Sequence, residues 1–269
     1  MDFAKYRVRP GSKVDLKKWD PDDSSASPVT KEERQSRLAE LAGELDKLQD
    51  LLYAEHKRSV LVVLQGMDTS GKDGTIRHVF GEVDPLGVRV AAFKRPTEEE
   101  ASRDFLWRVH QKVPGKGEVV IFNRSHYEDV LVVRVHKSIT NAECKRRYRR
   151  IREFEQLLID NGTVVLKLFL HISKDEQKRR LQERVDDPKK QWKFNLADLA
   201  ERKLWRSYTN AYADALGATS TAAAPWYVVP SNSKTNRNLV VSSVLRDTLK
   251  AMKLKYPRPS EKLDGIVVE

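Results

Sequence analysis

The sequence predicts a three-layer α/β/α fold, in which helices cover both faces of a parallel sheet. Five short apolar runs rich in β-branched residues alternate with segments whose apolar residues recur at helical spacing. No internal repeat, low-complexity tract or linker divides the chain. We therefore expect one α/β domain spanning residues 1–269.

The first half of the chain divides into an arm, a long helix and three strand–helix steps. Residues 1–29 lack periodicity and predict an extended arm laid on the body. Leucines at helical spacing, with Thr30 and Glu33 as a capping box, predict a helix that ends near Glu55. Their stripe, Leu38 to Leu52, fits either the core or a subunit contact. Strands are predicted at 59–66, 88–93 and 117–125, and helices are predicted to begin near Gly71 and Thr97.

The second half continues the alternation. Strands are predicted at 162–173 and 226–231. Helices are predicted at 142–161, 174–184, 192–216 and 235–252, with a break at Asp187-Pro188. Residues 178–212 are expected to form a helical lid.

Charge and cysteine content limit the function classes. The net charge of +11 favours a polyanionic partner, which includes nucleic acid, an acidic membrane face or a phosphate-rich small molecule. Cys144 is the single cysteine, so the chain has neither an internal disulfide nor a thiolate metal cage. The absence of a signal core and of a membrane-spanning apolar run predicts a cytoplasmic protein.

The stretch VLQGMDTSGKDGTI, residues 63–76, has the pattern of a phosphate-binding loop between a strand and a helix. Backbone amides of such a loop cradle phosphate oxygens, and Lys72 adds a positive charge. The alternative is a tight turn with a surface lysine. The predicted phosphate-contacting residues of the loop are Gly66, Met67, Thr69, Ser70, Gly71, Asp73 and Gly74.

Two carboxylates in this loop are unusual. Asp73 stands where a hydroxyl residue ordinarily holds magnesium, and Asp68 lies inside the cradle. Because a carboxylate repels phosphate unless a cation lies between them, Asp68 is predicted to bind Mg²⁺ directly or through water, or to accept a proton from an attacking phosphate. Asp73 also fits a simpler role at the positive end of the helix dipole.

A second group of polar residues, in FNRSHYEDVLV (122–132), follows the third predicted strand. Ligands bind at the carboxyl edge of open α/β sheets, so these residues are expected beside the loop. Arg124 is suited to clamp a transferring phosphoryl group. Glu128 and Asp129 are candidates for metal or nucleotide contacts, whereas His126 is expected to be a packing residue.

The third group lies in KRRLQERVDDPKKQWKFNLADLAERKLWRSYTNAY, residues 178–212, which combines many cations with aromatic residues. It fits either a solvated basic face or a lid that closes over phosphates and excludes water. The aromatic residues are expected to pack. The cations are Lys178, Arg179, Arg180, Arg184, Lys189, Lys190 and Lys193.

These stretches together resemble the polyphosphate kinase 2 family, in the order GMDTSGKDG, FNRSHYEDVLV, the basic segment and APWYVVPSNSKTNR. The resemblance covers about residues 5–249. It implies a P-loop kinase-like fold and Mg²⁺-dependent, reversible transfer of a terminal phosphoryl group between inorganic polyphosphate and nucleoside mono- or diphosphates. AMP and ADP are the expected acceptors, ATP the product, and guanine nucleotides further acceptors.

The resemblance also assigns roles to residues. Asp68, Lys72 and Arg124 would lie at the reacting phosphates. Arg95 joins the substrate-binding set, and Asp129 joins Asp68 as a metal ligand. A basic path for the polymer would be lined by Arg179, Arg180, Arg184, Lys189 and Lys193, with Arg184 also in the catalytic set.

One residue departs from the family pattern. Many members carry Asp where this chain has Asn123, which is also placed in the catalytic set. Asn is neither a general base nor a good metal ligand, so Glu128, Asp129 or Asp68 would take that role. The Asn form followed by SHYED resembles the branch that phosphorylates both AMP and ADP.

Two other functions fit parts of the sequence. One is an ATP-dependent nucleotide kinase with a thymidylate-kinase-like fold, and the other is a basic nucleic-acid-binding protein. No helix-turn-helix, finger or RNA-recognition motif supports the second, so we expect neither a nucleic acid nor a membrane as partner. The family resemblance implies a homodimer or homotetramer, with the leucine stripe at 38–52 as a candidate contact.

Overall fold

Five parallel strands form one sheet in the order β2-β3-β1-β4-β5. The computed structural model describes residues 3–28, 30–262, 264, 266 and 268. Strand bounds agree with the sequence prediction to within two residues. They are β1 Ser59–Gln65, β2 Val88–Ala92, β3 Val119–Asn123, β4 Thr163–His171 and β5 Trp226–Pro230.

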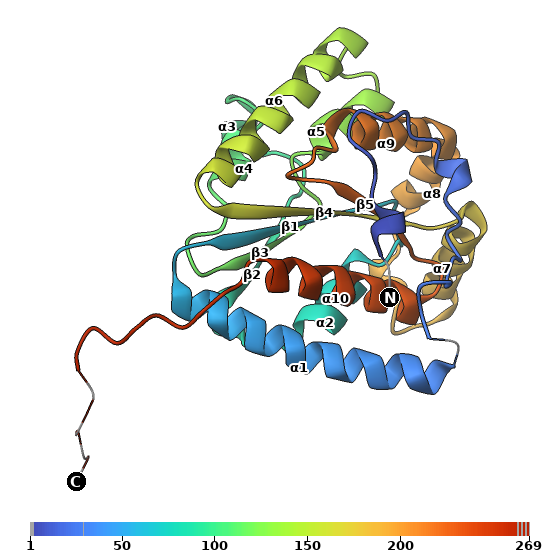
Figure 1. Cartoon of the computed structure of the whole chain (residues 1–269). Helices are drawn as coiled ribbons and strands as arrows, with labels where there is room; N and C mark the ends of the chain where they lie inside the picture. The colour runs from blue at the N-terminus through green and yellow to red at the C-terminus, as the bar shows by residue number, and fades with distance from the viewer. Residues whose placement is uncertain (1–2, 29, 263, 265, 267, 269) are drawn as a thin grey trace.

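Two layers of helices cover the sheet (Figure 1). One face carries α1 (Lys31–Glu55), α2 (Lys72–Phe80) and α10 (Lys234–Ala251). The opposite face carries α5 (Glu128–Val135), α6 (Asn141–Asp160) and α9 (Trp205–Thr219). The predicted α/β/α layering is therefore confirmed.

The alternation of side chains along β1 explains why both layers have an apolar core. Leu61 and Val63 belong to the cluster shared with α5, α6 and α9, whereas Val60, Val62 and Leu64 belong to the cluster shared with α1, α2 and α10. All seven residues of β1 are buried. A central parallel strand has no solvent-facing side, which is why its sequence is a continuous apolar run.

The long first helix is held by its cap and by its leucines. The Thr30–Glu33 capping box is present as predicted, with both reciprocal hydrogen bonds formed. Leu41, Leu45 and Leu52 are buried, and α1 packs on α10. These leucines therefore serve the core of this chain, whereas Leu38 and Leu48 are half-buried, and a subunit contact through the stripe stays a prediction.

The remaining helices follow β4 or lie between β2 and β3 in the chain. Beyond β4 the chain continues into α7 (Lys174–Asp186) and α8 (Leu196–Lys203), which Figure 1 shows at the end where β4 finishes. Between β2 and β3 are two single turns, α3 (Glu98–Ala101) and α4 (Trp107–His110). The 3-10 turns are Ala4–Tyr6, Leu16–Lys18, Pro85–Gly87 and Gln191–Lys193.

One helix was not predicted, and two predicted helices need correction. Residues 128–135 form α5, for which no element was predicted because the β-branched run VLVV gave no helical signal. The helix capped by Thr97 ends after one turn at Ala101. The helix predicted at 192–216 is interrupted, since Asn195 caps α8 anew and α9 begins only at Trp205.

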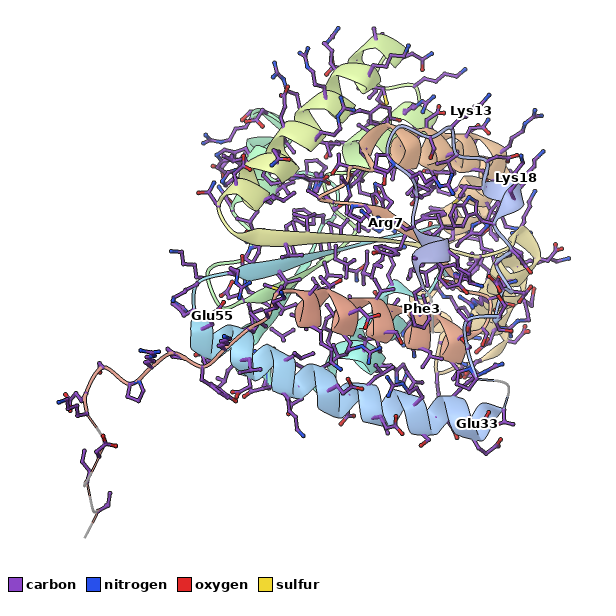
Figure 2. The ribbon with its side chains drawn as sticks, in the orientation of Figure 1. Phe3, Arg7, Lys13, Lys18, Glu33 and Glu55 are labelled. Atoms are coloured by element: carbon purple, nitrogen blue, oxygen red, sulfur yellow. The ribbon has the colours of Figure 1, made fainter. Side chains whose placement is uncertain are left out.

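The N-terminal arm lies on the body as predicted, with residues 1, 2 and 29 outside the described part of the chain. Val8 N donates to Trp226 O at 2.8 Å, and Arg7 forms an antiparallel bridge with Tyr227 of the edge strand. Figure 2 shows Phe3 and Arg7 against the body and Lys13 and Lys18 on its periphery. The arm thus covers the exposed edge of β5.

Two further facts bear on the sequence predictions. Within the described residues, none of the helices combines the length and apolarity needed to cross a bilayer. The thiol of Cys144 is buried.

Candidate active site

The phosphate-binding pattern forms a tight loop at the carboxyl end of β1. The strand ends at Gln65, and α2 begins at Lys72 with Gly71 as its N-cap. β3 ends beside this loop, since Leu64 pairs with Asn123. The two predicted polar groups are therefore brought together at one edge of the sheet.

Two glycines of the loop are required by close contacts. A Cβ on Gly66 would lie 2.6 Å from Ser70 Oγ and 2.8 Å from Leu170 O. Gly71 has φ of +104°, and a Cβ there would lie 1.9 Å from Nη1 of Arg237. Any other residue at Gly71 would be strained and would displace a buried guanidinium.

Lys72 points back into the loop. Its ammonium group donates to Gly66 O at 2.8 Å and to Met67 O at 3.3 Å. Burial lowers the pKa of this ammonium, and the neighbouring Arg124 lowers it further, while nearby carboxylates oppose the shift. An incoming phosphate would supply the negative charge that this buried cation lacks.

Arg124 joins the acids of the two motifs. Its Nη2 donates to Asp68 Oδ1 at 2.9 Å, and its Nη1 lies 3.6 Å from Glu128 Oε2. The Arg124 backbone has φ of +62°, an uncommon conformation for a non-glycine residue that often marks functional sites. Burial raises the pKa of Glu128, although Arg124 and Lys72 oppose the shift.

Asn123 contacts the loop through Asp73. Its Nδ2 donates to Asp73 Oδ1 at 2.7 Å. An aspartate at this position would place two carboxylates against each other, so asparagine suits Asp73 as a neutral partner.

A cavity of about 560 Å³ opens over the loop. It gathers eleven of the predicted site residues, which are Asp68, Thr69, Gly71, Lys72, Asp73, Gly74, Asn123, Arg124, Arg180, Arg184 and Lys193. We call it the main cavity. Residues that the sequence analysis did not assign to the site also line it, namely Ala92, Phe93, Lys94, Glu183, Lys190, Trp192, Asn195, Asp198 and Lys234.

A second, smaller cavity of about 40 Å³ shares Asp68 and Arg124 with the main cavity. It contains the predicted residues Gly66, Met67 and Glu128. Its other lining residues come from α5, α7, α8 and α9, and they are Val132, Gln177, Glu201, Arg202, Trp205, Tyr208 and Tyr212. Asp68 and Arg124 thus line both spaces.

The cations of residues 178–212 do not all line the main cavity. Arg184 lies at the main cavity, where its Nη1 donates to Lys193 O at 3.2 Å and lies 3.4 Å from Asp198 Oδ2. Arg179 faces away, paired with Glu176 and Glu183, and Lys189 is exposed outside the main cavity.

Arg180 is 6% exposed and has a different environment from the other cations. Its guanidinium donates to four backbone carbonyls and to Glu176. It therefore braces the loop, while its place on a polymer path stays a prediction.

Two further predicted site residues lie outside the main cavity. Asp129 is buried and faces Arg108 at 3.5 Å and Arg147 at 3.8 Å, outside both cavities that contain Asp68. It is an ion-pair partner for these arginines, and its role as a metal ligand stays a prediction. Arg95 is exposed outside the main cavity, where its neighbour Lys94 takes the lining position.

His126 is a packing residue, as predicted. It is fully buried, lies against the rings of Phe122, Tyr127 and Phe154, and approaches Glu155 at 3.4 Å. Glu155 in turn pairs with buried Lys167 at 2.6 Å.

The carboxylates of Asp68 and Asp73 suit a hard cation such as Mg²⁺ that takes its remaining ligands from water and phosphate. No group of three or more His, Cys, Asp or Glu side chains suited to a metal occurs among the described residues. Asp68 and Asp73 both line the main cavity beside the phosphate loop. Mg²⁺ commonly uses one or two carboxylates and completes its shell with water and phosphate oxygens, so this donor set suits it.

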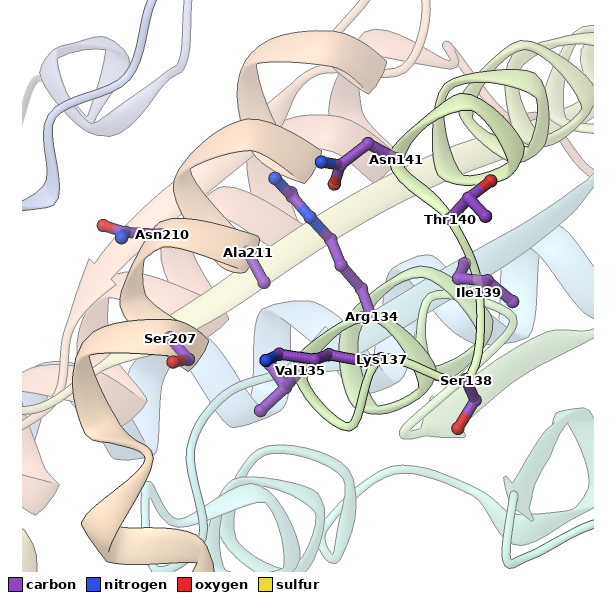
Figure 3. A pocket seen from close by; sticks show the side chains of 10 residues that line it. All are labelled: Arg134, Val135, Lys137, Ser138, Ile139, Thr140, Asn141, Ser207, Asn210 and Ala211. Carbon is purple, nitrogen blue, oxygen red and sulfur yellow. The ribbon is translucent and has the colours of Figure 1, made fainter.

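A separate cavity of about 560 Å³ lies between the end of α5, the start of α6 and α9. Figure 3 shows Arg134 directed into it, with Lys137, Asn141 and Asn210 around it. Arg134 is already bonded to Tyr148 and Asp214. No predicted site residue lines this cavity.

Comparison with known proteins gives a consistent assignment. The Polyphosphate kinase 2 (PPK2) family model matches residues 28–257. A relative from Meiothermus ruber named AMP/ADP-polyphosphate phosphotransferase is 57% identical over 267 residues, covering 99% of this chain and 100% of its own. The ADP-polyphosphate phosphotransferase of Rhodopseudomonas palustris is 44% identical over 264 residues, covering 94% of this chain and 91% of its own.

A solved structure agrees with the same assignment. The crystal structure of Polyphosphate Kinase 2 from Arthrobacter aurescens superposes with a TM-score of 0.95 at 43% identity, covering 98% of this chain and 94% of that one. The chain therefore belongs to the polyphosphate kinase 2 family.

Proposed function

We propose that the chain transfers the terminal phosphoryl group of inorganic polyphosphate to AMP and to ADP, in a reversible reaction that requires Mg²⁺. The observation that carries this proposal is the main cavity, where the phosphate loop, Arg124 and the cations of residues 178–212 line one space. The name of the Meiothermus ruber relative supports AMP and ADP as acceptors. Both are adenine nucleotides, and guanine nucleotides are further candidates.

The reaction needs positioning and charge neutralisation more than covalent chemistry. An oxygen of the acceptor's terminal phosphate forms a bond to the last phosphorus of the polymer, and the P–O bond to the rest of the chain breaks. The electron pair stays on the shortened polyphosphate. A phosphate acceptor is largely ionised near neutral pH, so no strong general base is required.

Lys72 and Arg124 neutralise the transferring group in this proposal. Lys72 is buried against the start of the loop, and Arg124 stands between the two cavities. Charge that develops on the transferring oxygens would be met by an ammonium from one side and a guanidinium fork from the other. Asn123 holds Asp73 and serves as a positioning group instead of a base.

Asp68, with Asp73, would hold Mg²⁺ beside the phosphates. When bound, the ion neutralises charge on the polymer and on the acceptor. Asp68 keeps its second oxygen available while Oδ1 accepts from Arg124.

Residues 178–212 act as the lid in this proposal. Arg184 and Lys193 line the main cavity and would hold the polymer, with Lys190 and Lys234 as further cations there. The lid would also exclude water from the reacting phosphates. We place the enzyme in the cytoplasm as a homodimer or homotetramer, with the half-buried Leu38 and Leu48 of α1 as part of a candidate contact.

The test is an assay of the purified chain with AMP or ADP, polyphosphate and Mg²⁺, without ATP. Chromatography of the nucleotides should show ADP followed by ATP from AMP, and ATP from ADP. A chelator should abolish both. Absence of product from either acceptor, with ATP-dependent activity in its place, would favour the nucleotide-kinase alternative.

A further inference from the structure

Helix α7 contacts three consecutive backbone carbonyls of the phosphate loop. Gln177 Nε2 donates to Asp68 O at 3.1 Å. Arg180 Nη1 donates to Thr69 O at 2.8 Å and to Ser70 O at 3.1 Å. Since the acceptors are backbone oxygens, these contacts fix the path of the loop whatever its side chains do.

Arg180 also ties the loop to a third segment. Its Nη2 donates to Ser231 O at 2.6 Å and to Asn232 O at 2.8 Å, in the turn between β5 and α10. Its Nε donates to Glu176 Oε1 at 2.6 Å. All five N–H groups of the guanidinium are thereby used, and a lysine at this position could satisfy fewer of these acceptors.

These contacts stabilise a loop conformation whose backbone is strained at Thr69. Thr69 has φ of +65°, in the left-handed region that residues with a Cβ seldom adopt. Because a trans peptide points its C=O and the next N–H in opposite directions, holding Asp68 O and Ser70 O directs the amides of Thr69 and Gly71 away from their α7 donors. The loop's amides are thus oriented before any phosphate arrives.

The same face of α7 also contacts the part of the lid segment that follows it, residues 187–212. Gln177, Arg180 and Arg184 follow a spacing of three and four residues, which puts them on one side of a helix. Arg184 lies in the main cavity near Lys193 and Asp198. Gln177 Oε1 accepts from Arg202 of α8 at 3.0 Å, and Arg202 also donates to Lys174 O at 2.6 Å.

We propose that Arg180 and Gln177 are positioning residues that hold the phosphate loop in its binding conformation and couple it, through α7, to residues 187–212 of the lid segment. This inference rests on the proposed function for its catalytic consequence. The claim that these two residues hold the loop concerns the protein without substrate, so it does not depend on the proposed function.

The first experiment measures hydrogen exchange of the backbone amides of residues 66–74 without substrate, by mass spectrometry. Arg180→Lys should speed exchange in this segment by about tenfold or more, because two or more hydrogen bonds to the loop carbonyls are lost or weakened. The matched control is Arg150→Lys on α6, whose arginine bonds only to Glu153 among the contacts recorded for the described residues. Unchanged exchange in folded Arg180→Lys would overturn the proposal.

A second pair of variants keeps the test decisive if Arg180→Lys fails to fold. Gln177→Ala removes the donor to Asp68 O and the acceptor for Arg202. Its control is Gln182→Ala on the same helix, where the amide donates to Asp186 instead. Faster exchange at 66–74 in Gln177→Ala alone supports the proposal, and equal exchange in both variants contradicts it.

Kinetics then separate positioning from polymer contact. Arg180→Lys should lower kcat about tenfold or more while leaving the slope of log KM for polyphosphate against log salt as in the wild type. Loss of a polymer contact would instead flatten that slope, since each neutralised phosphate releases a counterion. A flattened slope with unchanged kcat would return Arg180 to the polymer path. Because the exchange experiment uses no substrate, failure of the proposed function would leave its result intact.

Discussion

The ammonium group of Lys72 lies 2.8 Å from Gly66 O and 3.3 Å from Met67 O, with its charge buried beside Arg124. Lys72→Ala removes a cation from the transferring group without removing a large part of the core. We expect kcat to fall roughly 10²- to 10³-fold, as for loss of one preorganised charge donor. Steady-state kinetics checks this, with exposed Lys116→Ala as the control.

Lys72→Ala should lower turnover without destabilising the fold. Circular dichroism of Lys72→Ala should match the wild type, and its thermal midpoint should not fall, because the buried cation is itself unfavourable. Wild-type turnover in the variant would mean that the loop does not bind the reacting phosphates.

Glu128 gives a residue-scale prediction in pH. Burial raises its carboxyl pKa, so the native state holds a proton that the unfolded state releases between pH 4.5 and the raised pKa. Native stability from this group is therefore present at low pH and is lost as pH rises through the folded pKa. Glu128→Gln should remove that loss. The thermal midpoint of the variant should therefore rise relative to that of the wild type as the pH increases from 4.5 to 8.

The control for this pH series is exposed Glu82→Gln, which should track the wild type throughout. A midpoint difference between Glu128→Gln and the wild type that stays constant across the range would show that Glu128 does not titrate differently in the two states.

At the scale of elements, the junction between the loop and α2 requires a glycine at position 71. Gly71→Ala must place a methyl group against the Arg237 guanidinium and keep φ positive. We expect the free energy of unfolding to fall by at least about 2 kcal/mol. Urea denaturation measures this directly.

Gly43 supplies the matched control. It lies in the middle of α1, and a Cβ there would have nothing within 4 Å. Gly43→Ala should raise the free energy of unfolding by about 0.5–1 kcal/mol. Equal effects of the two substitutions would contradict the packing of Arg237 beneath the loop.

The lid segment gives a kinetic prediction. Arg184→Ala should raise the KM for polyphosphate by about 10- to 100-fold, the range for a lost charge-assisted hydrogen bond. The KM for AMP or ADP should change far less, and Arg150→Ala should change neither. A larger effect on the nucleotide KM would assign Arg184 to the acceptor.

The elements that the sequence predicted well are those with a strong local signal. β1 and β4 are continuous apolar runs, and α1 has a capping box and a leucine stripe. α5 escaped prediction because VLVV has strand propensity, and its packing against α6 and α9 decides for helix. The break at Asn195 is likewise set by a side-chain cap inside a helical pattern.

At the scale of the whole molecule, the site is assembled from strand ends far apart in the chain. Asp68 and Lys72 belong to one local motif and Arg124 to another, so each could be predicted from the residues beside it in the sequence. Lys94 after β2 and Lys234 after β5 reach the main cavity only through the sheet order, so no local pattern marked them. The partners of Arg180 and Asp129 could not be predicted, because a charge in a sequence does not reveal whether another group already pairs with it.

Part of the net charge of +11 is concentrated around the main cavity. Seven lysines and arginines outside the loop line the main cavity together with Lys72, namely Lys94, Arg124, Arg180, Arg184, Lys190, Lys193 and Lys234. Against them stand the carboxylates of Asp68, Asp73, Glu183 and Asp198. A cavity with this excess of cations suits a long inorganic polyanion better than a single nucleotide.

The most direct measurement follows the fate of one phosphorus atom. Polyphosphate labelled with ³²P at its terminal residue, mixed with excess enzyme, ADP and Mg²⁺ for a single turnover, should place the label in the γ-phosphate of ATP and leave the polymer one unit shorter. Label that remains in the polymer while ATP forms, or that appears as free phosphate, would contradict direct transfer from the chain end to the nucleotide.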